Sequence, residues 1–319
     1  MKKTKDLLSV IDFTKSEFIH IFNLSASLKE KLKKGKKYLP LTGKTLAMIF
    51  QKPSTRTRTS FEVGMTQLGG HAIFLSSQET QVKRGETFAD TARTLSRYVN
   101  GIMVRADAHN DIIDLAKNAS VPIINGLSDM EHPCQIMADI FTIIEKKAKP
   151  MDSNTWQKKG LYDIKITYIG DGNNVANSLL LACAIMGMKI TVCTPKGYEP
   201  DNNILDMGKR IIEKSKGTIE IQNDPFEAVK DSDVLYTDVW TSMGKEKEKE
   251  ERMNIFKNYQ INKNLISKAK PDVLIMHCLP AHRGEEISTE VMDGPNSIVF
   301  DQAENRLHVQ KAILVYLLG

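Results

Sequence analysis

Short apolar runs alternate with longer amphipathic segments twice along the 319 residues, and this pattern constrains the fold more than any other feature of the sequence. The alternation occupies the first half of the chain, stops in an irregular Lys- and Pro-containing stretch after residue 146, and then resumes. Strands that alternate with helices predict parallel sheets with helices on both faces. The sequence therefore predicts an α/β fold of two doubly wound parallel-sheet domains, residues 1–146 and 147–319.

Capping residues and turn residues mark where individual elements begin and end. Thr14-x-x-Glu17 is a capping box that predicts the start of the first helix, and Pro53-Ser54 predicts the start of the second. A charged stretch, residues 245–252, predicts a solvated helix with Lys247–Glu251 and Glu248–Arg252 pairs. The predicted strands are residues 44–50, 71–76, 101–106, 121–126, 164–170, 189–195, 218–224, 233–240, 272–280 and 297–302.

Composition and charge exclude several classes of protein. The chain is 41% hydrophobic and 26% charged with a net charge of +5, as in an ordinary soluble globular protein. Charges of both signs are mixed, and the densest basic run, residues 29–38, ends a predicted helix, so we expect no nucleic-acid partner. The four cysteines show no C-x-x-C spacing, and neither a signal segment nor a membrane span is predicted. These features predict a cytoplasmic protein with reduced thiols and no membrane partner.

The stretch "FQKPSTRTRTSFE" at residues 50–62 follows the first predicted strand and carries cations among hydroxyl groups. Ligands bind parallel α/β sheets where strands end, and a helix that begins at Ser54 would direct its free N–H groups there. A guanidinium forks onto two phosphate oxygens, and hydroxyls add donors. Either an N-capped helix with solvated arginines or a phosphate or carboxylate site fits the local chemistry, and we favour the anion site.

The turn "IGDGNN" after the strand at residues 164–170 resembles a dinucleotide-binding loop only in part. Gly170-x-Gly172 is present, but Val175 occupies the position of the third glycine, and no acid ends the next strand. These departures argue against a nicotinamide-dependent dehydrogenase. The turn remains a candidate ligand loop, in which Asn174 could donate and accept hydrogen bonds.

Three other strand ends carry candidate functional groups. His132 and Gln135 lie at a predicted helix start, where a neutral imidazole could donate to a carbonyl oxygen, and Arg105 ends a strand at the same rim. Asp238 ends a strand and suits a substrate ammonium group. Cys278 follows His277, but adjacent strand residues point to opposite faces, so the two do not predict a nucleophilic dyad.

These motifs together resemble the aspartate/ornithine carbamoyltransferases. Ser54-Thr55-Arg56-Thr57-Arg58 resembles the family's carbamoyl-phosphate motif, and His132-Pro133-Cys134-Gln135 resembles its second motif in the ornithine-type version. The segments Asp238…Ser242-Met243-Gly244 and His277-Cys278-Leu279-Pro280 resemble its ornithine-binding loop and second ornithine signature. The resemblance spans essentially the whole chain in the family's order.

The resemblance implies transfer of a carbamoyl group from carbamoyl phosphate to the δ-amine of L-ornithine, with no cofactor, metal or covalent intermediate. It also implies a homotrimer, in which Gln81 reaches a neighbouring subunit's site, and a last helix, about residues 304–319, that packs back on the first domain. Catalysis would involve Arg105, His132, Asp238 and Cys278. The residues implied to bind carbamoyl phosphate are Ser54, Thr55, Arg56, Thr57, Gln81, Arg105, His132, Gln135, Leu279 and Arg306, and those implied to bind ornithine are Asn174, Asp238, Ser242, Met243 and Cys278.

One departure and several alternatives accompany this resemblance. Ala281-His282-Arg283-Gly284 follows Pro280, where many relatives have an arginine directly after the proline, so no role is assigned to Arg283. The open alternatives are aspartate, putrescine or acetylated ornithine as acceptor, a dehydrogenase, and a non-catalytic binding protein. Aspartate would need cations where this chain presents Asp238, and putrescine would not need a loop that holds an α-carboxylate.

Overall fold

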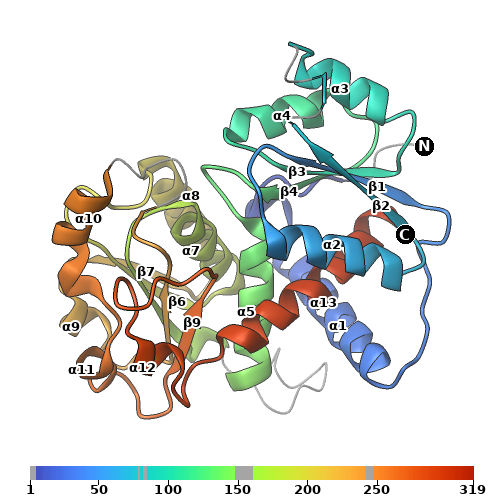
Figure 1. Cartoon of the computed structure of the whole chain (residues 1–319). Coiled ribbons are helices and arrows are strands. Elements are labelled where there is room, and N and C mark those ends of the chain that lie inside the picture. Colours follow the sequence, from blue (N-terminus) through green and yellow to red (C-terminus); the bar gives the residue numbers. More distant parts are fainter. Residues whose placement is uncertain (1–4, 78–79, 82–84, 148–160, 242–247) are drawn as a thin grey trace. The chain divides into compact units, whose positions relative to one another are not determined.

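The computed structural model describes residues 5–77, 80–81, 85–147, 161–241 and 248–319 (Figure 1). It divides into two compact units, one formed by Met1–Phe141 with Glu304–Gly319 and the other by Thr142–Ala303. The domain boundary expected from the sequence after residue 146 stays a prediction. The described helices include none long and apolar enough to cross a membrane.

The first unit contains a four-stranded parallel sheet in the order β2-β1-β3-β4. The central strands β1 and β3 are almost entirely buried, as expected of parallel strands covered on both faces. Helices α3 and α4 cover one face, and α2 lies on the other (Figure 1). The strands are β1 (Thr45–Phe50), β2 (His71–Ser76), β3 (Gly101–Arg105) and β4 (Ile123–Leu127). The helices are α1 (Lys15–Lys33), α2 (Thr55–Gln67), α3 (Phe88–Leu95), α4 (His109–Asn118) and α5 (Pro133–Lys147), with a 3-10 turn at Val10–Asp12.

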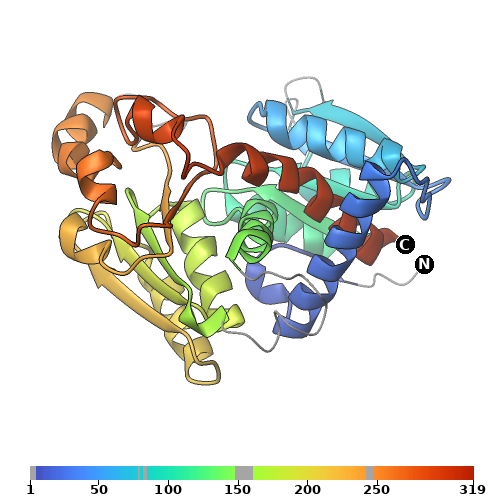
Figure 2. The ribbon, with the colours of Figure 1, turned by 90° about the horizontal axis from the view of Figure 1, so that it is seen from below.

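Helix α1 begins where the sequence predicts. Thr14 and Glu17 form the capping box, and Gly35 adopts a positive φ of 65° just beyond the helix. The C-terminal helix α13 (Val299–Leu318) runs beside α1 in both views (Figures 1 and 2). The Tyr316 hydroxyl donates to Glu17 at 2.7 Å, and Lys29 donates to Asn305 at 2.8 Å. Residues from Glu304 onward therefore belong to the first unit.

The second unit contains a five-stranded parallel sheet in the order β7-β6-β5-β8-β9. Helices α7 and α8 lie on one side, and the shorter helices α9 to α12 lie on the other around a core that includes Trp240, Phe256 and Ile275 (Figure 1). The strands are β5 (Lys165–Ile169), β6 (Lys189–Cys193), β7 (Thr218–Gln222), β8 (Val234–Thr237) and β9 (Leu274–His277). The helices are α7 (Asn174–Met186), α8 (Asn202–Ile212), α9 (Pro225–Ala228), α10 (Lys249–Phe256), α11 (Lys263–Ile266) and α12 (Thr289–Met292), with 3-10 turns at Leu161–Asp163 and Lys257–Tyr259.

The fold class predicted from the sequence is confirmed, with one error in the strand assignment. Residues 297–302 were expected to be a strand, but Val299 opens α13. Among residues 297–302, the described strand-type pairing is an isolated bridge between Ser297 and Ile275. A short apolar run fits a strand or a buried helix equally well, and here it continues into a twenty-residue helix.

Candidate active site

Strand order places a topological switch point in each sheet, which is where doubly wound folds bind ligands. In the first sheet the chain leaves β1 for β2 on one side, and β3 lies on the other. In the second sheet, β6 and β8 flank β5 in the same manner. The "STRTR" segment follows β1 and Arg105 ends β3, while the "GDGNN" turn follows β5 and Asp238 follows β8. Most sequence-predicted site residues therefore lie at the carboxyl ends of strands, in one unit or the other.

Ser54 is the N-cap of α2, as the sequence predicts. Its hydroxyl accepts a hydrogen bond from the backbone N–H of Thr57 at 3.3 Å. Thr57 is buried, whereas Thr55 is exposed and Arg56 is partly buried. The first turn of α2 therefore combines hydroxyls and a guanidinium at the end of β1.

Arg306 of α13 connects three predicted residues of the first unit. It is only 3% exposed, and its guanidinium donates to Gln135 and, at 3.2 Å, to Thr57 Oγ1. Gln135 in turn donates to Asp139 at 2.8 Å. These bonds bring the C-terminal helix, the start of α5 and the start of α2 to one place.

His132 lies directly before α5 and is 5% exposed. Burial, together with the positive charges of Arg306, Arg105 and Arg56, lowers the pKa of His132 well below 6.5. The imidazole is therefore neutral at pH 7 and can donate one hydrogen bond. Three guanidiniums acting on one buried imidazole define a strongly positive site that suits an anion.

The other cations of the "FQKPSTRTRTSFE" stretch have different partners. Arg58 pairs with Glu62 at 3.0 Å, and its guanidinium lies over the Phe74 ring, 3.8 Å from the centroid. Lys52 pairs with Asp107 at 2.9 Å. Of the three cations in this stretch, Arg56 is thus the one that acts on His132. Gln81 is exposed, and its backbone carbonyl accepts from Glu86 at 3.1 Å.

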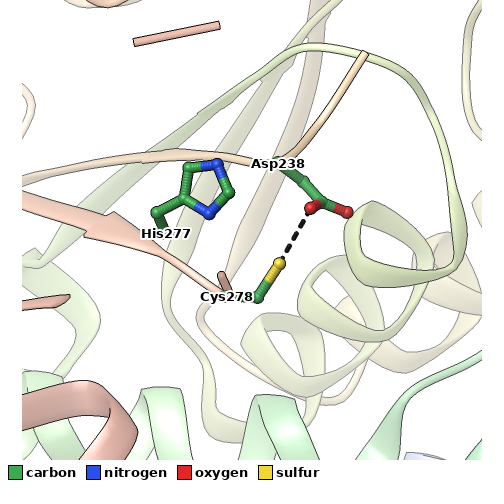
Figure 3. Close-up of side chains that lie close together, drawn as sticks. All are labelled: Asp238, His277 and Cys278. Atoms are coloured by element: carbon green, nitrogen blue, oxygen red, sulfur yellow. Dashed lines mark hydrogen bonds between the residues drawn. The ribbon is translucent and has the colours of Figure 1, made fainter. Parts of the chain in front are cut away.

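Asp238 is the centre of a polar cluster in the second unit. It is 7% exposed, and its Oδ1 accepts from the Cys278 thiol at 2.9 Å and from the Val239 N–H at 2.8 Å. Figure 3 shows the thiol pointing toward this carboxylate, while the His277 ring is directed elsewhere. A carboxylate with a thiol beside it can bind an ammonium group and accept a proton from it.

The remaining predicted residues of the second unit are placed only in part. Asn174 is the first residue of α7, and Leu279 follows Cys278. Ser242 and Met243 lie outside the described residues.

Asn173 belongs to this cluster, although the sequence motifs point only to its neighbour Asn174. The Asn173 side-chain oxygen accepts from the N–H groups of Val175 and Ala176, at 2.9 and 3.1 Å, and so caps α7. Its amide nitrogen donates to Asp238 Oδ2 at 2.8 Å. An Asn immediately before a helical run is a known N-cap signal, and that signal could have identified it.

His277 supports the segment that carries Cys278 without contacting the thiol. Its Nε2 lies 3.0 Å from Glu286 Oε1, and its Nδ1 accepts from the Leu279 N–H at 2.8 Å. The Leu279 bond fixes the ring as the tautomer that donates from Nε2 to Glu286. The absence of a nucleophilic dyad between His277 and Cys278 stays a prediction.

Two groups in the described part of the chain bring three possible metal-ligand atoms within 4.8 Å of one another: Asp238, His277 and Cys278, and His282, Glu285 and Glu286. In the first group, the Cys278 thiol donates a hydrogen bond to Asp238, and His277 Nδ1 accepts one from the Leu279 N–H. Both groups thus already take part in hydrogen bonds or ion pairs within the protein.

Comparison with known proteins connects these two sites to one family. The family model "Aspartate/ornithine carbamoyltransferase, carbamoyl-P binding domain" matches residues 5–145, and the model "Aspartate/ornithine carbamoyltransferase, Asp/Orn binding domain" matches residues 162–317. An ornithine carbamoyltransferase from Pyrococcus abyssi is 55% identical over 318 residues, covering 99% of this chain and 96% of the relative. The ornithine carbamoyltransferase from Anoxybacillus flavithermus is 53% identical, covering 99% of this chain and 97% of the relative.

Solved structures agree with these sequence matches. The structure of the Pyrococcus furiosus ornithine carbamoyltransferase superposes with a TM-score of 0.93 at 54% identity, covering 99% of this chain and 97% of the other. The first matched range contains Thr57, His132 and Gln135, and the second contains Asp238, Cys278 and Arg306. The chain belongs to the aspartate/ornithine carbamoyltransferase family.

Proposed function

We propose that the chain transfers the carbamoyl group of carbamoyl phosphate to the δ-amine of L-ornithine, giving L-citrulline and phosphate. The main support for this assignment is the Asp238 cluster. In it, a buried carboxylate at the switch point of the second sheet is hydrogen-bonded to Asn173 and Cys278. A carboxylate there suits an amine acceptor, whereas aspartate would bring a second carboxylate of its own. Relatives that are 51–55% identical over nearly their whole length carry the name ornithine carbamoyltransferase, which supports the same acceptor.

The first unit supplies what carbamoyl phosphate requires. The start of α2, with the side chains of Ser54, Thr55 and Arg56, suits the phosphate, because helix N-termini and guanidiniums both favour anions. Arg105, Thr57 and neutral His132 suit the carbonyl oxygen, on which negative charge develops in the reaction. Gln135 and Arg306 complete the set proposed for this unit, and Leu279 is proposed to contact carbamoyl phosphate from the second unit.

The reaction needs alignment and electrostatic stabilisation more than any reactive protein group. A neutral δ-amine attacks the carbonyl carbon, the new C–N bond forms, and the C–O bond to phosphate breaks. The proton that the nitrogen loses in this step is taken up by the departing phosphate. Holding both substrates aligned replaces a bimolecular encounter, and preorganised donors stabilise the oxyanion without reorganising during the step. No covalent intermediate is needed.

The second unit is proposed to bind the δ-amine of ornithine and to accept a proton from it. Ornithine enters with its δ-amine protonated, because free alkyl amines have pKa values near that of lysine, about 10.4. Asp238 is proposed to bind this ammonium and to accept its proton, with Cys278 bonded to the same carboxylate oxygen. Asn174, Ser242 and Met243 are proposed to hold the amino-acid end of ornithine, which putrescine lacks.

The deciding experiment is an acceptor comparison with purified protein. Carbamoyl phosphate is supplied with L-ornithine, putrescine, L-aspartate or N-acetyl-L-ornithine, and the carbamoylated product is measured by colour reaction. L-Ornithine is expected to give the highest kcat/KM, and Asp238→Asn is expected to lower it while the affinity for carbamoyl phosphate is kept. A different best acceptor would leave the family membership intact but refute the assignment of ornithine.

We further propose a homotrimer in which Gln81 reaches the site of a neighbouring subunit. The exposed position of Gln81 is compatible with such a contact. Light scattering should give three times the chain mass of 35.9 kDa. Mixing two inactive variants, Arg56→Ala and Gln81→Ala, and exchanging their subunits should restore activity, because some sites then receive both native residues. Absence of recovery after proven exchange would refute the shared site.

A cytoplasmic location is proposed as well. All four cysteines are free thiols, which suits a reducing compartment. The prediction is that the protein, isolated from cells under conditions that trap thiols, has its four cysteines reduced.

A further inference from the structure

Arg252 differs from the solvated residue that the sequence predicts. It lies on α10 in the run "KEKEKEER", yet only 4% of its surface is exposed. The predicted pair with Glu248 exists, with Nε donating to Oε2 at 2.8 Å, while Lys247 of the other predicted pair lies outside the described residues. The pair with Glu248 does not explain the burial, because half of the Glu248 side chain is exposed.

The buried end of the guanidinium connects two turns at the carboxyl edge of the second sheet. Nη1 donates to Asp171 Oδ2 at 2.8 Å and to the carbonyl oxygen of Trp240 at 2.9 Å. Asp171 lies in the turn after β5, and Trp240 lies two residues beyond Asp238, after β8. Strands β5 and β8 are the pair at the switch point, so Arg252 bonds to both turns that border it.

The hydrogen bond between Asn173 and Asp238 joins these two turns, because Asn173 lies in the turn after β5 and Asp238 lies in the turn after β8. The backbone carbonyl of Asp171 accepts from the N–H of Asn173 at 2.7 Å. In the other turn, the N–H of Val239, between Asp238 and Trp240, donates to the Asp238 carboxylate at 2.8 Å. A shift of either turn would change the distance between Asn173 and Asp238, and with it the direction of the carboxylate.

A guanidinium can hydrogen-bond to both turns at once better than an ammonium can. It is planar and presents several N–H donors at fixed angles, so one side chain can satisfy three acceptors in different directions. Its face also lies over the Tyr198 ring, 5.1 Å from the centroid. Tyr198 itself accepts, through its carbonyl, from the N–H of Gly172 in the first turn, at 2.8 Å.

We propose that Arg252 is a positioning residue for the acceptor amine: it sets the separation of the two turns and so aims the Asp238 carboxylate at the ornithine δ-nitrogen. This inference rests on the proposed function. Arg252 itself touches neither substrate. Its loss should therefore weaken ornithine binding and turnover while carbamoyl-phosphate binding, which the first unit is proposed to provide, is retained.

Arg252→Lys is the primary test of this proposal. The substitution keeps the positive charge but removes the planar set of N–H donors that the guanidinium provides. We expect the KM for L-ornithine to rise about tenfold or more, as when a buried charged hydrogen bond is lost. The dissociation constant of carbamoyl phosphate should change less than about twofold, since the second unit is not proposed to provide most of its contacts. Arg210→Lys is the matched control, because Arg210 is exposed on α8 of the same unit and its replacement should leave both constants unchanged.

Replacing the partners separates positioning from general packing. Asp171→Asn should raise the KM for ornithine, and combining it with Arg252→Lys should add little further, because both changes break the same link. Glu248→Gln, at the exposed end, should have a much smaller effect. Circular dichroism and thermal melting establish whether each variant is folded. If Arg252→Lys does not fold, the kinetics of Asp171→Asn test the proposal instead.

A folded Arg252→Lys or Asp171→Asn protein with the wild-type KM for ornithine would overturn the proposal. Equal losses of ornithine and carbamoyl-phosphate affinity would also overturn it, because they would indicate a general structural role. If the wild-type protein makes no citrulline, the proposed function fails first, and that outcome is distinct from wild-type kinetics in the variants.

Discussion

Asn173 performs two tasks with one amide, and two substitutions can separate them. Its oxygen caps α7 through the N–H groups of Val175 and Ala176, and its nitrogen donates to Asp238. Ser is as good an N-cap as Asn, but its short hydroxyl cannot also supply the amide donor to Asp238. Ala can do neither. The pair Asn173→Ser and Asn173→Ala therefore distinguishes helix capping from support of the carboxylate.

The expected magnitudes follow from the two sets of bonds. Loss of an N-cap costs about 1 kcal/mol, and loss of a hydrogen bond to a charged group costs about 1.5–3 kcal/mol. In stability, Asn173→Ala should be lower than Asn173→Ser by about 1 kcal/mol, or about 2–4 °C in the Tm of a unit of this size. In catalysis, both variants lose the 2.8 Å bond to Asp238, and about 2 kcal/mol corresponds to roughly a thirtyfold fall in kcat/KM for ornithine.

The assays are steady-state citrulline formation with ornithine varied, and thermal melting followed by circular dichroism. The two variants should show similar kinetic losses and different melting temperatures. Wild-type kcat/KM in Asn173→Ser would show that Asp238 needs no support from Asn173. Equal melting temperatures for Ser and Ala would show that the observed cap contributes nothing to stability.

Three further predictions concern single side chains. Arg56→Ala should lower kcat by about a hundredfold or more without unfolding the protein, and wild-type turnover in the folded variant would remove Arg56 from the phosphate site. Burial and three arginines lower the pKa of His132 well below 6.5, so the stabilisation from keeping this imidazole neutral is complete above pH 6.5 and is lost as pH falls from 6.5 toward the lowered pKa. The Tm should therefore vary less between pH 7 and pH 5 in His132→Asn than in wild type. A thiol reagent at neutral pH should label Cys278 alone, since burial raises the thiol pKa of Cys134 and Cys193 to about 12 and that of Cys183 still further, and labelling of a second thiol in the native protein would contradict this.

The alternation of strands and helices was sufficient to predict the fold class because it depends on local periodicity. Parallel strands with both faces covered read as continuous apolar runs, as β1 and β3 do. The same property produced the error at residues 297–302, where an apolar run begins a buried helix. Local sequence carries no information on what covers a run, and so it cannot separate the two cases.

Site residues were predictable where a motif and a strand end coincide. Ser54 shows its role locally, since the capping hydroxyl and the N–H that it caps are three residues apart. Arg306 was implied only by resemblance, because its partners Gln135 and Thr57 lie 171 and 249 residues away in the chain. The roles assigned to all the candidate site residues, with Ser242, Met243 and Gln81 among them, stay predictions.

The charge pattern predicts the partner of Arg252 correctly but predicts its burial wrongly. Its i,i+4 spacing to Glu248 predicts a surface pair, and that pair forms with a 2.8 Å bond. The guanidinium, however, has a second side, and that side is buried against Asp171, 81 residues earlier in the chain. Burial of an arginine needs acceptors for most of its donors, and here two of them come from turns that border the switch point. A buried arginine between two turns that are proposed to bind a ligand is therefore better explained by the position of those turns than by the helix on which it lies.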